Sequence, residues 1–400
     1  MPEPGGVTRV GFIMKRIVQR WCAAMLLAGV MSTAVLGHER VVRARTPVRI
    51  PDIPGYRTLK CDFHIHTVFS DGSVWPTVRS EEAWREGLDA VAITDHIEYQ
   101  PHKEDLPTNH NRAYDIARPE GEALNVIVIH GSEVTRSMPP GHLNAIFLED
   151  SDALDVEDWR DALDAARRQG AFVFWNHPGW DAQLEEDGKM RWYDEHTELV
   201  EKGILQGIEV ANSREVYPEA FAWALERKLT LMSNSDVHAP VNLDYHVHDG
   251  DHRPLTLVFA RERTAESIHE ALKDRRTAVY ADHRLLGEEQ FLGPIFRGSV
   301  KVLNSAAEFR STGSVLVQIH NDSEIEYQLE RDGEVAGLTF PSSLTLPPLK
   351  TVLAKVQVTS MEPAGKRDVG LPYRVTNLLV APEQALRVEL PLQIVIVPNP

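Results

Sequence analysis

The chain of 400 residues contains only two cysteines, Cys22 and Cys61. Cys22 lies in a segment that we expect to be removed, so Cys61 would be left alone and an internal disulfide is excluded. A fold without disulfides must be stabilised mainly by its hydrophobic core, which a chain of this length can provide. Cys61 has the opposite strand parity to His64 and His66, which favours a packing role over a nucleophilic one.

Positive charge is also scarce. The chain has 42 Lys and Arg residues against 59 Asp and Glu residues, a formal net charge of −17. Nucleic acids and anionic membranes attract basic surfaces, so this balance excludes a general nucleic-acid binder. An anionic small molecule could bind only where the protein provides a local positive site.

Long apolar runs are absent after the first 37 residues. Before that point, a basic stretch ending at Arg20 is followed by the apolar run WCAAMLLAGVMSTAVLG (Trp21–Gly37). This order is typical of a secretory signal, so we expect residues 1–37 to be cleaved off before His38. The protein would then be periplasmic or secreted, with no stable membrane association. An uncleaved membrane anchor is the alternative, and Met14 could be the true start.

Histidine is nearly absent from the last part of the chain. Fifteen of the 17 histidines lie between positions 64 and 283, and only His320 follows them. We therefore expect any chemistry that uses imidazole to belong to a front domain.

Two patterns divide the chain into domains. From residue 59 to 293, short apolar runs alternate with amphipathic helical patterns, such as the one that begins after the N-cap residue Thr264. The strand-like runs are 61–67, 90–96, 125–135, 141–149, 171–178, 207–212 and 229–238. Seven strands in this alternation predict an α/β fold with a closed or nearly closed barrel, preceded by an N-terminal extension over 38–58. From 294 to 400, apolar residues alternate with period two and no helical pattern remains, which predicts a small antiparallel β-sandwich.

Ionisable side chains follow the ends of most of these strand-like runs. Strand C-termini of a parallel barrel meet at one mouth, so we expect these side chains to converge. The candidates are His64, His66, Asp71, His96, Glu133, His142, His177, Asp236 and His238. Buried together without a cation, the carboxylates would repel one another and the imidazoles would lack partners. The mixture of imidazole and carboxylate suits two or three zinc, manganese or iron ions, with Asp62 and Asp95 orienting the ligands.

Seven motifs carry a resemblance to a known family. They are DFHIHTVFSDG, ITDH, GSEVT, GHLNAIF, FWNHPGW, GIEVAN and SDVH, in this order along the chain. Their order and spacing resemble the PHP superfamily of metal-dependent phosphoesterases. The longer strings HIEYQPH, PPGHLNAIF and HRPLTLVFA are similar to its exported phosphodiesterase branch, the Sb-PDE-type enzymes. The resemblance covers the chain from about Leu59 to Gly293.

This resemblance implies a distorted (βα)7 barrel with a trinuclear metal centre. His64, His66, Glu133 and Asp236 would hold one ion. Glu133 would bridge to a second ion that His142 and His177 hold, and Asp71, His96 and His238 would hold the third. Some members of the superfamily have histidine where this chain has Asp71.

The expected reaction is hydrolysis of a small-molecule phosphodiester by a hydroxide that bridges two metals. Arg112 and Arg136 are candidate phosphate-binding residues because guanidinium matches phosphate geometry. His177, His238 or a metal-bound water could protonate the departing alcohol, and Trp180 could form the wall of a pocket. Three alternatives stay open: a phosphomonoesterase, a metal-dependent carboxylester or carbamate hydrolase, and a non-enzymatic binding protein. Substrate identity and oligomeric state have no signature in the sequence.

Overall fold

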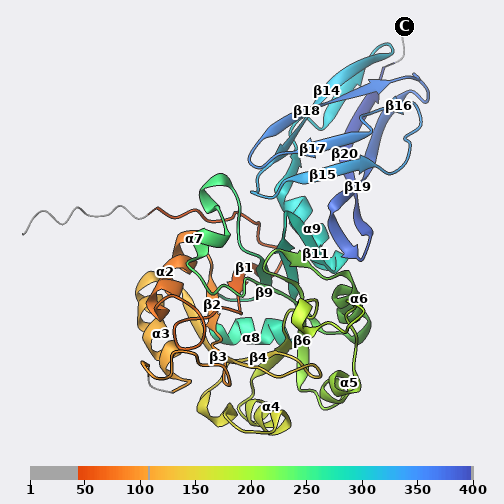
Figure 1. Cartoon of the computed structure of the whole chain (residues 1–400). Helices are drawn as coiled ribbons and strands as arrows, with labels where there is room; N and C mark the ends of the chain where they lie inside the picture. The colour runs from red at the N-terminus through yellow and green to blue at the C-terminus, as the bar shows by residue number, and fades with distance from the viewer. Residues whose placement is uncertain (1–43, 107–108, 398–400) are drawn as a thin grey trace, which may run out of the picture. The chain divides into compact units, whose positions relative to one another are not determined.

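A computed structural model describes residues 44–106 and 109–397 of the chain, except for the side chain of His248 (Figure 1). The predicted secretory signal, residues 1–37, lies outside these ranges. Within the described ranges, no helix is both long enough and apolar enough to cross a membrane.

The front domain is a strongly twisted sheet that closes on itself. Its strands are β1 (Arg57–Asp62), β2 (Ala90–Ile93), β3 (Ile127–Val134), β4 (Leu143–Ile146), β5 (Phe172–Trp175), β6 (Leu205–Asn212), β8 (Thr230–Asn234) and β9 (Leu255–Ala260). β1, β2 and β3 are parallel neighbours, as are β5, β6 and β8. A parallel bridge between Ile65 and Val237 joins the segments that follow β1 and β8. This bridge closes the distorted barrel and confirms the predicted α/β fold.

The sheet departs from a purely parallel arrangement at β4. This strand runs antiparallel to both of its neighbours, β3 and β5. The loop between β3 and β4 covers only residues 135–142, whereas a crossover between parallel strands needs a dozen or more residues. The polypeptide therefore turns back, and His142 at the end of this loop lies next to Glu133 near the end of β3.

Helices cover the outside of the sheet. They are α2 (Pro76–Glu86), α3 (Arg112–Leu124), α4 (Trp159–Arg168), α5 (Asp194–Glu201), α6 (Pro218–Arg227), α7 (Val241–Asp244) and α8 (Ala265–Lys273). Figure 1 shows α2 and α3 side by side next to β2 and β3. The side chain of Thr264 accepts a hydrogen bond from the Ser267 amide, which confirms the predicted N-cap of α8.

The C-terminal domain consists of two layers whose strands are antiparallel, except that β13 pairs in parallel with β20. One sheet contains β12 (Val300–Val302), β14 (Gly313–Asn321), β18 (Thr351–Val358) and β16 (Leu338–Thr339). The other layer contains β13 (Ala306–Phe309), β15 (Tyr327–Arg331), β17 (Ser343–Leu346), β19 (Gly365–Ala381) and β20 (Gln384–Ile396). Val317 and Ile319 of β14 are buried between exposed neighbours, as period-two alternation predicts. The predicted antiparallel β domain is confirmed.

The two domains share one core. Helix α9 (Glu289–Ser299) crosses the predicted domain boundary between residues 293 and 294. Strands β10 (Thr277–Ala281) and β11 (Arg284–Gly287) form a hairpin, and Leu285 and Leu286 of β11 pair with β19. The Phe296 ring of α9 packs edge-on against Tyr327, with ring centroids 5.2 Å apart. The Tyr327 hydroxyl donates a hydrogen bond of 2.8 Å to Ser299 Oγ.

Candidate metal centre

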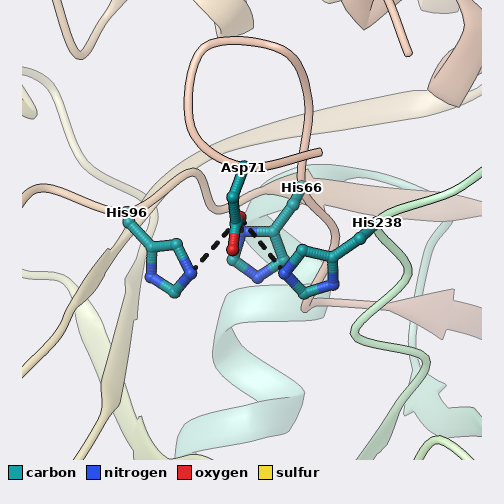
Figure 2. Close-up of side chains that lie close together, drawn as sticks. All are labelled: His66, Asp71, His96 and His238. Carbon is teal, nitrogen blue, oxygen red and sulfur yellow. Dashed lines mark ion pairs between the residues drawn. The ribbon is translucent and has the colours of Figure 1, made fainter. Parts of the chain in front are cut away.

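All nine predicted ligands lie together at the mouth of the barrel. His64 and His66 follow β1, His96 follows β2, His177 follows β5, and Asp236 and His238 follow β8. They form four overlapping groups, and within each group the candidate ligand atoms lie within 4.8 Å of one another. The groups are His66, Asp71, His96 and His238; His64, His177 and Asp236; His64, His66 and Glu133; and Glu133, His142 and His177. Figure 2 shows the first of them, with the Asp71 carboxylate between the rings of His96 and His238.

Two carboxylates occupy the centre of the cluster. Glu133 Oε2 lies 3.2 Å from His64 Nε2 and 3.3 Å from His66 Nε2, and Glu133 Oε1 lies 2.7 Å from His142 Nδ1. Asp236 Oδ1 lies 3.2 Å from His64 Nε2 and 3.1 Å from His66 Nε2. Glu133 is completely buried. The arrangement therefore places two acids among several imidazoles in a site largely shielded from water.

Several of these atoms are close together but do not form hydrogen bonds. Five buried ligand atoms lack a hydrogen-bond partner in the structure: His66 Nε2, Asp71 Oδ1, Glu133 Oε1, His142 Nδ1 and His177 Nδ1. A buried polar atom without a partner costs about 1–3 kcal/mol. Lone pairs that converge without hydrogen-bond geometry are what a cation requires, so the residues fit the binding of divalent metal ions.

The electrostatics of the cluster also favour a cation. Burial by itself would lower the pKa of His96, yet the Glu133 and Asp71 carboxylates raise it to about 9. Burial would raise the pKa of Glu133, but the surrounding histidines hold it well below its usual value. Both shifts show that the acids attract positive charge into a site that otherwise disfavours ions.

Four of the candidate histidine ligands are held in orientation by contacts to their Nδ1 atoms. The Nδ1 atom of His64 lies 3.0 Å from Glu209 Oε1, and that of His66 lies 3.3 Å from Ser70 Oγ. The Nδ1 atom of His96 lies 2.6 Å from Thr135 Oγ1, and that of His238 lies 2.7 Å from the Asp236 carbonyl oxygen. These contacts leave Nε2 of His64, His66 and His238 facing the carboxylates, whereas His96 has its Nδ1 3.1 Å from Glu133 Oε2 and its Nε2 3.5 Å from Asp71 Oδ1. Such outer contacts fix the ring orientation and the tautomer of a metal ligand.

Glu209 is a residue that we did not single out from the sequence. It lies in β6, is fully buried, and its Oε1 also accepts a hydrogen bond of 2.9 Å from Asn234 Nδ2. Its Oε2 accepts hydrogen bonds from the His177 amide at 2.7 Å and from Asn212 Nδ2 at 2.8 Å. The sequence did contain a signal for Glu209: an acid inside the apolar run GIEVAN is expected to be buried, and a buried acid needs hydrogen-bond partners.

Asp62 and Asp95 contact the backbone and side chains around the ligands. Asp95 accepts hydrogen bonds from the Thr67 amide at 2.7 Å and from Ser70 Oγ at 2.6 Å, and Ser70 contacts His66. Asp62 accepts a hydrogen bond of 2.6 Å from Ser235 Oγ, next to Asp236. Both acids therefore fix the segments that carry ligands.

Two ligands have strained backbones. His177 has a φ of 28° and Asp236 a φ of 54°, values in the left-handed region that favours glycine. The Glu209 carboxylate holds the His177 amide, and the His64 carbonyl accepts a hydrogen bond of 2.8 Å from the Asp236 amide. Such strain is typical of functional sites, where surrounding contacts maintain it.

Two cavities open at the cluster. One, of about 510 Å³, is lined by six of the nine candidate ligands together with Trp180, Arg214 and Tyr217. The second, of about 460 Å³, contains Arg136, Gln183 and Tyr193 and shares His142 and Trp180 with the first. Trp180 is half-exposed, and its ring lies 5.4 Å from His142 and 5.3 Å from His177. The Trp180 side chain therefore separates the two cavities.

The two arginines predicted to bind phosphate lie in different places. Arg136 lines the second cavity, where its Nη1 pairs with Glu98 Oε1 at 2.5 Å. Arg112 is the exposed first residue of α3 and is not among the described residues that line either cavity. Arg214, which sequence reasoning missed, lines the first cavity, where its Nη2 pairs with Asp251 at 2.6 Å.

Comparisons with known proteins agree with this geometry. An Ig-like domain family model matches residues 300–391. No similar curated protein was found. A two-domain protein from Bacteroides vulgatus, described as containing a predicted PHP-like metal-dependent phosphoesterase, is 43% identical, with a TM-score of 0.82 over 88% of this chain and 100% of its own.

Two further solved structures match less well. A proposed metal-dependent phosphoesterase from Bifidobacterium adolescentis is 19% identical, with a TM-score of 0.35 over 44% of this chain and 87% of its own. An amidohydrolase from Chromobacterium violaceum with bound sulfate is 17% identical, with a TM-score of 0.35 over 45% of this chain and 88% of its own. The family assignment rests on the Bacteroides protein, which matches both domains. This chain belongs to the PHP-like metal-dependent phosphoesterases, and it is a metal-dependent hydrolase with a C-terminal Ig-like domain.

Proposed function

We propose that the protein is an exported phosphodiesterase that acts on a small-molecule phosphodiester. The observation that carries this proposal is the pair of cavities on either side of Trp180, which share His142. A phosphodiester has a substituent on each of two ester oxygens, whereas a monoester has only one. Two spaces that meet at the candidate ligands accommodate both substituents.

We propose one divalent ion for each of the three sets of ligands that the family resemblance implies. The four groups of candidate ligands support metal binding, and zinc, manganese or iron suits their mixed imidazole and carboxylate donors. When bound, such ions lower the pKa of water towards neutrality and neutralise charge on phosphoryl oxygens. The protein supplies the ligand positions and the orientation of each imidazole. A local cation site also explains how a chain with a net charge of −17 accepts an anionic substrate.

Side-chain exposure distinguishes the two histidines that are candidate proton donors. The His238 side chain is 39% exposed, whereas that of His177 is only 7% exposed. His238 is therefore the more accessible of the two, but its Nδ1 lies 2.7 Å from the Asp236 carbonyl and its Nε2 3.2 Å from Asp71 Oδ1, so as a metal ligand it has no free proton for a departing alcohol. Arg214 lies in the same cavity and has guanidinium donors beyond the Nη2 that Asp251 uses, so it is our candidate for an additional contact to the anionic substrate.

A substrate panel tests the reaction. Purified protein loaded with zinc, manganese or iron should hydrolyse bis(p-nitrophenyl) phosphate with a higher kcat/KM than p-nitrophenyl phosphate or p-nitrophenyl acetate. Preference for the monoester would replace the proposal with a phosphomonoesterase. Preference for the acetate would replace it with a carboxylester hydrolase, and absence of turnover with every metal would support a binding protein.

Export is tested separately. The basic stretch and apolar run before His38 predict a mature N-terminus at that residue. Expression of the full chain in a bacterial host should yield the protein in the periplasmic fraction, and N-terminal sequencing should begin at His38. Recovery of an uncleaved chain in the membrane fraction would contradict the proposal and favour an anchor.

A further inference from the structure

Arg79 is a fully charged residue in an unusual position. It lies on α2, a helix that contributes none of the nine candidate ligands, and only 1% of its surface is exposed. A guanidinium carries five N–H donors and no acceptor. Burying it is costly unless every donor finds a partner.

All five donors of Arg79 have acceptors. Nε donates to the His66 carbonyl at 2.8 Å. Nη1 donates to Glu82 Oε2 at 2.7 Å and to the Ala239 carbonyl at 2.9 Å. Nη2 donates to the carbonyls of Val237 and His238, both at 2.9 Å. Four of the five acceptors are thus main-chain carbonyls, and they belong to only two segments of the chain.

Those two segments carry metal ligands and are far apart in sequence. The main chain joins them up to Val237: the Asp236 amide donates to the His64 carbonyl at 2.8 Å, and the His66 amide donates to the Val237 carbonyl at 3.1 Å. This pairing fixes Asp236 without help from Arg79. After Val237 the strand-like pairing ends, and the His238 carbonyl is held by Arg79 and by the Ser73 amide at 2.8 Å.

The consequence concerns one group of ligands in particular. His66 and His238 stack with ring centroids 4.2 Å apart and an angle of 15°, and they belong to the same group as Asp71 and His96 (Figure 2). We propose that Arg79 is a positioning residue that holds His238 against His66 and thereby completes the metal site of Asp71, His96 and His238. The inference rests on the proposed function, because it requires that this group holds an ion.

Substitution of Arg79 by lysine tests the inference. Lysine keeps the positive charge but concentrates three donors at one point, so it cannot reach both segments. Loss of an outer contact to a metal site typically lowers metal affinity about 10- to 100-fold. In R79K, titration with zinc or manganese, followed by elemental analysis after dialysis against buffered metal, should show that one ion per chain is weakened by this factor. The other ions should stay bound.

The matched control is Arg263→Lys. Arg263 also uses several donors to join two segments: it contacts Asp89 Oδ1 at 2.8 Å and the carbonyl of Asn125 at 2.6 Å. Asp89 and Asn125 precede β2 and β3, at the end of the sheet opposite to the candidate ligands. R263K should therefore lower the melting temperature, by less than R79K because the Arg263 side chain is partly exposed, while leaving metal content and affinity unchanged.

A double-mutant cycle with His238→Ala separates the possible outcomes. If Arg79 acts through His238, R79K/H238A should lose no more metal than H238A alone. Equal metal affinity in R79K and the wild type, or parallel loss of all ions together with the fold, would overturn the inference. If H238A itself retains the wild-type metal content, the three-ion proposal fails instead.

A milder variant covers the case in which R79K does not fold. Glu82 Oε1 accepts a hydrogen bond of 2.8 Å from the Val241 amide while Oε2 holds Arg79, so Glu82→Gln keeps the shape and removes the charge. E82Q should weaken the same single ion by several-fold. An unchanged metal titration in folded E82Q would count against the inference.

Discussion

The two domains bury polar residues in different ways. In the C-terminal domain, Asn321 is completely buried, and its side-chain nitrogen donates to the carbonyls of Ile325 and Leu346 at 2.7 and 3.0 Å. In the front domain, Glu133, His66 and His177 are buried but have atoms without hydrogen-bond partners. A satisfied buried amide stabilises a particular backbone arrangement, whereas a convergent set of unsatisfied acids and imidazoles is typical of a site that binds a cation.

The largest expected effect comes from a central acid. Glu133→Gln keeps the shape of the side chain but removes the charge that faces the histidines. We expect turnover of bis(p-nitrophenyl) phosphate to fall by at least about 10³-fold, because metal ions contribute several kcal/mol to such reactions. Elemental analysis should show less bound metal. The control is His320→Gln in the C-terminal domain, where the His320 side chain lies 3.0 Å from Thr351 Oγ1 and 4.0 Å from Asp322. Reduced turnover in H320Q would show that the loss of turnover in Glu133→Gln is not specific to the candidate metal ligands.

The second prediction concerns the core that the domains share. Phe296 lies in α9, the helix that links the two domains; it is 3% exposed and packs against Tyr327 of the C-terminal domain. Phe296→Ala should lower the free energy of unfolding by about 3–5 kcal/mol. Because one buried cluster contains residues of both domains, calorimetry should show a single transition at a lower temperature. Leu353→Ala, at a residue that is 60% exposed, should change stability by less than about 0.5 kcal/mol. Two calorimetric transitions, of which only one shifts to a lower temperature in Phe296→Ala, would show that the domains unfold independently.

The clustering of the nine candidate ligands could be predicted from the sequence because strand geometry is regular. Residues two apart share a face, and strand C-termini share a mouth, so His64, His66 and Asp236 were recognisable as neighbours. The direction of β4 was harder to foresee, because it depends on the length of one loop. Arg79 was not predictable, since four of its partners are main-chain carbonyls and carry no residue signature.

Cavity-lining residues were predictable only in part, for the same reason. Trp180 was recognisable because it follows His177 closely in the chain. Arg214 comes from the segment after β6, and only the folded chain brings it to the cavity. The exposure of Arg112 likewise depends on how α3 packs, which the helical pattern alone does not determine.

The third prediction uses a buried histidine outside the cluster. His196 stacks on Trp175, with ring centroids 3.8 Å apart, and burial lowers its pKa from 6.5 to about 4. Between these values the unfolded chain binds a proton that the folded chain does not. Stability should therefore be complete above pH 6.5 and fall as the pH drops, by about 3 kcal/mol in total from this residue.

The measurement compares wild type with His196→Phe, which keeps an aromatic ring but cannot be protonated. Chemical unfolding at pH 7 and at pH 4.5 should show a smaller pH-dependent loss in the variant. H320Q serves as the control in the C-terminal domain and should keep the wild-type slope, because its histidine is partly exposed. An identical slope in H196F and the wild type would assign the acid sensitivity to other groups.

The smallest expected effect compares two buried amides. Gln183 is 5% exposed, lines the second cavity, and has no hydrogen-bond partner for either amide atom in the structure, unlike Asn321. We expect Gln183→Leu to lower kcat/KM for a phosphodiester about five- to tenfold, the contribution of one hydrogen bond to a substituent, without loss of stability. Asn321→Leu should do the reverse, lowering the melting temperature while kcat/KM stays unchanged. Equal effects of Q183L on diester and monoester hydrolysis would show that the second cavity does not hold the second substituent, because a monoester leaves that cavity empty.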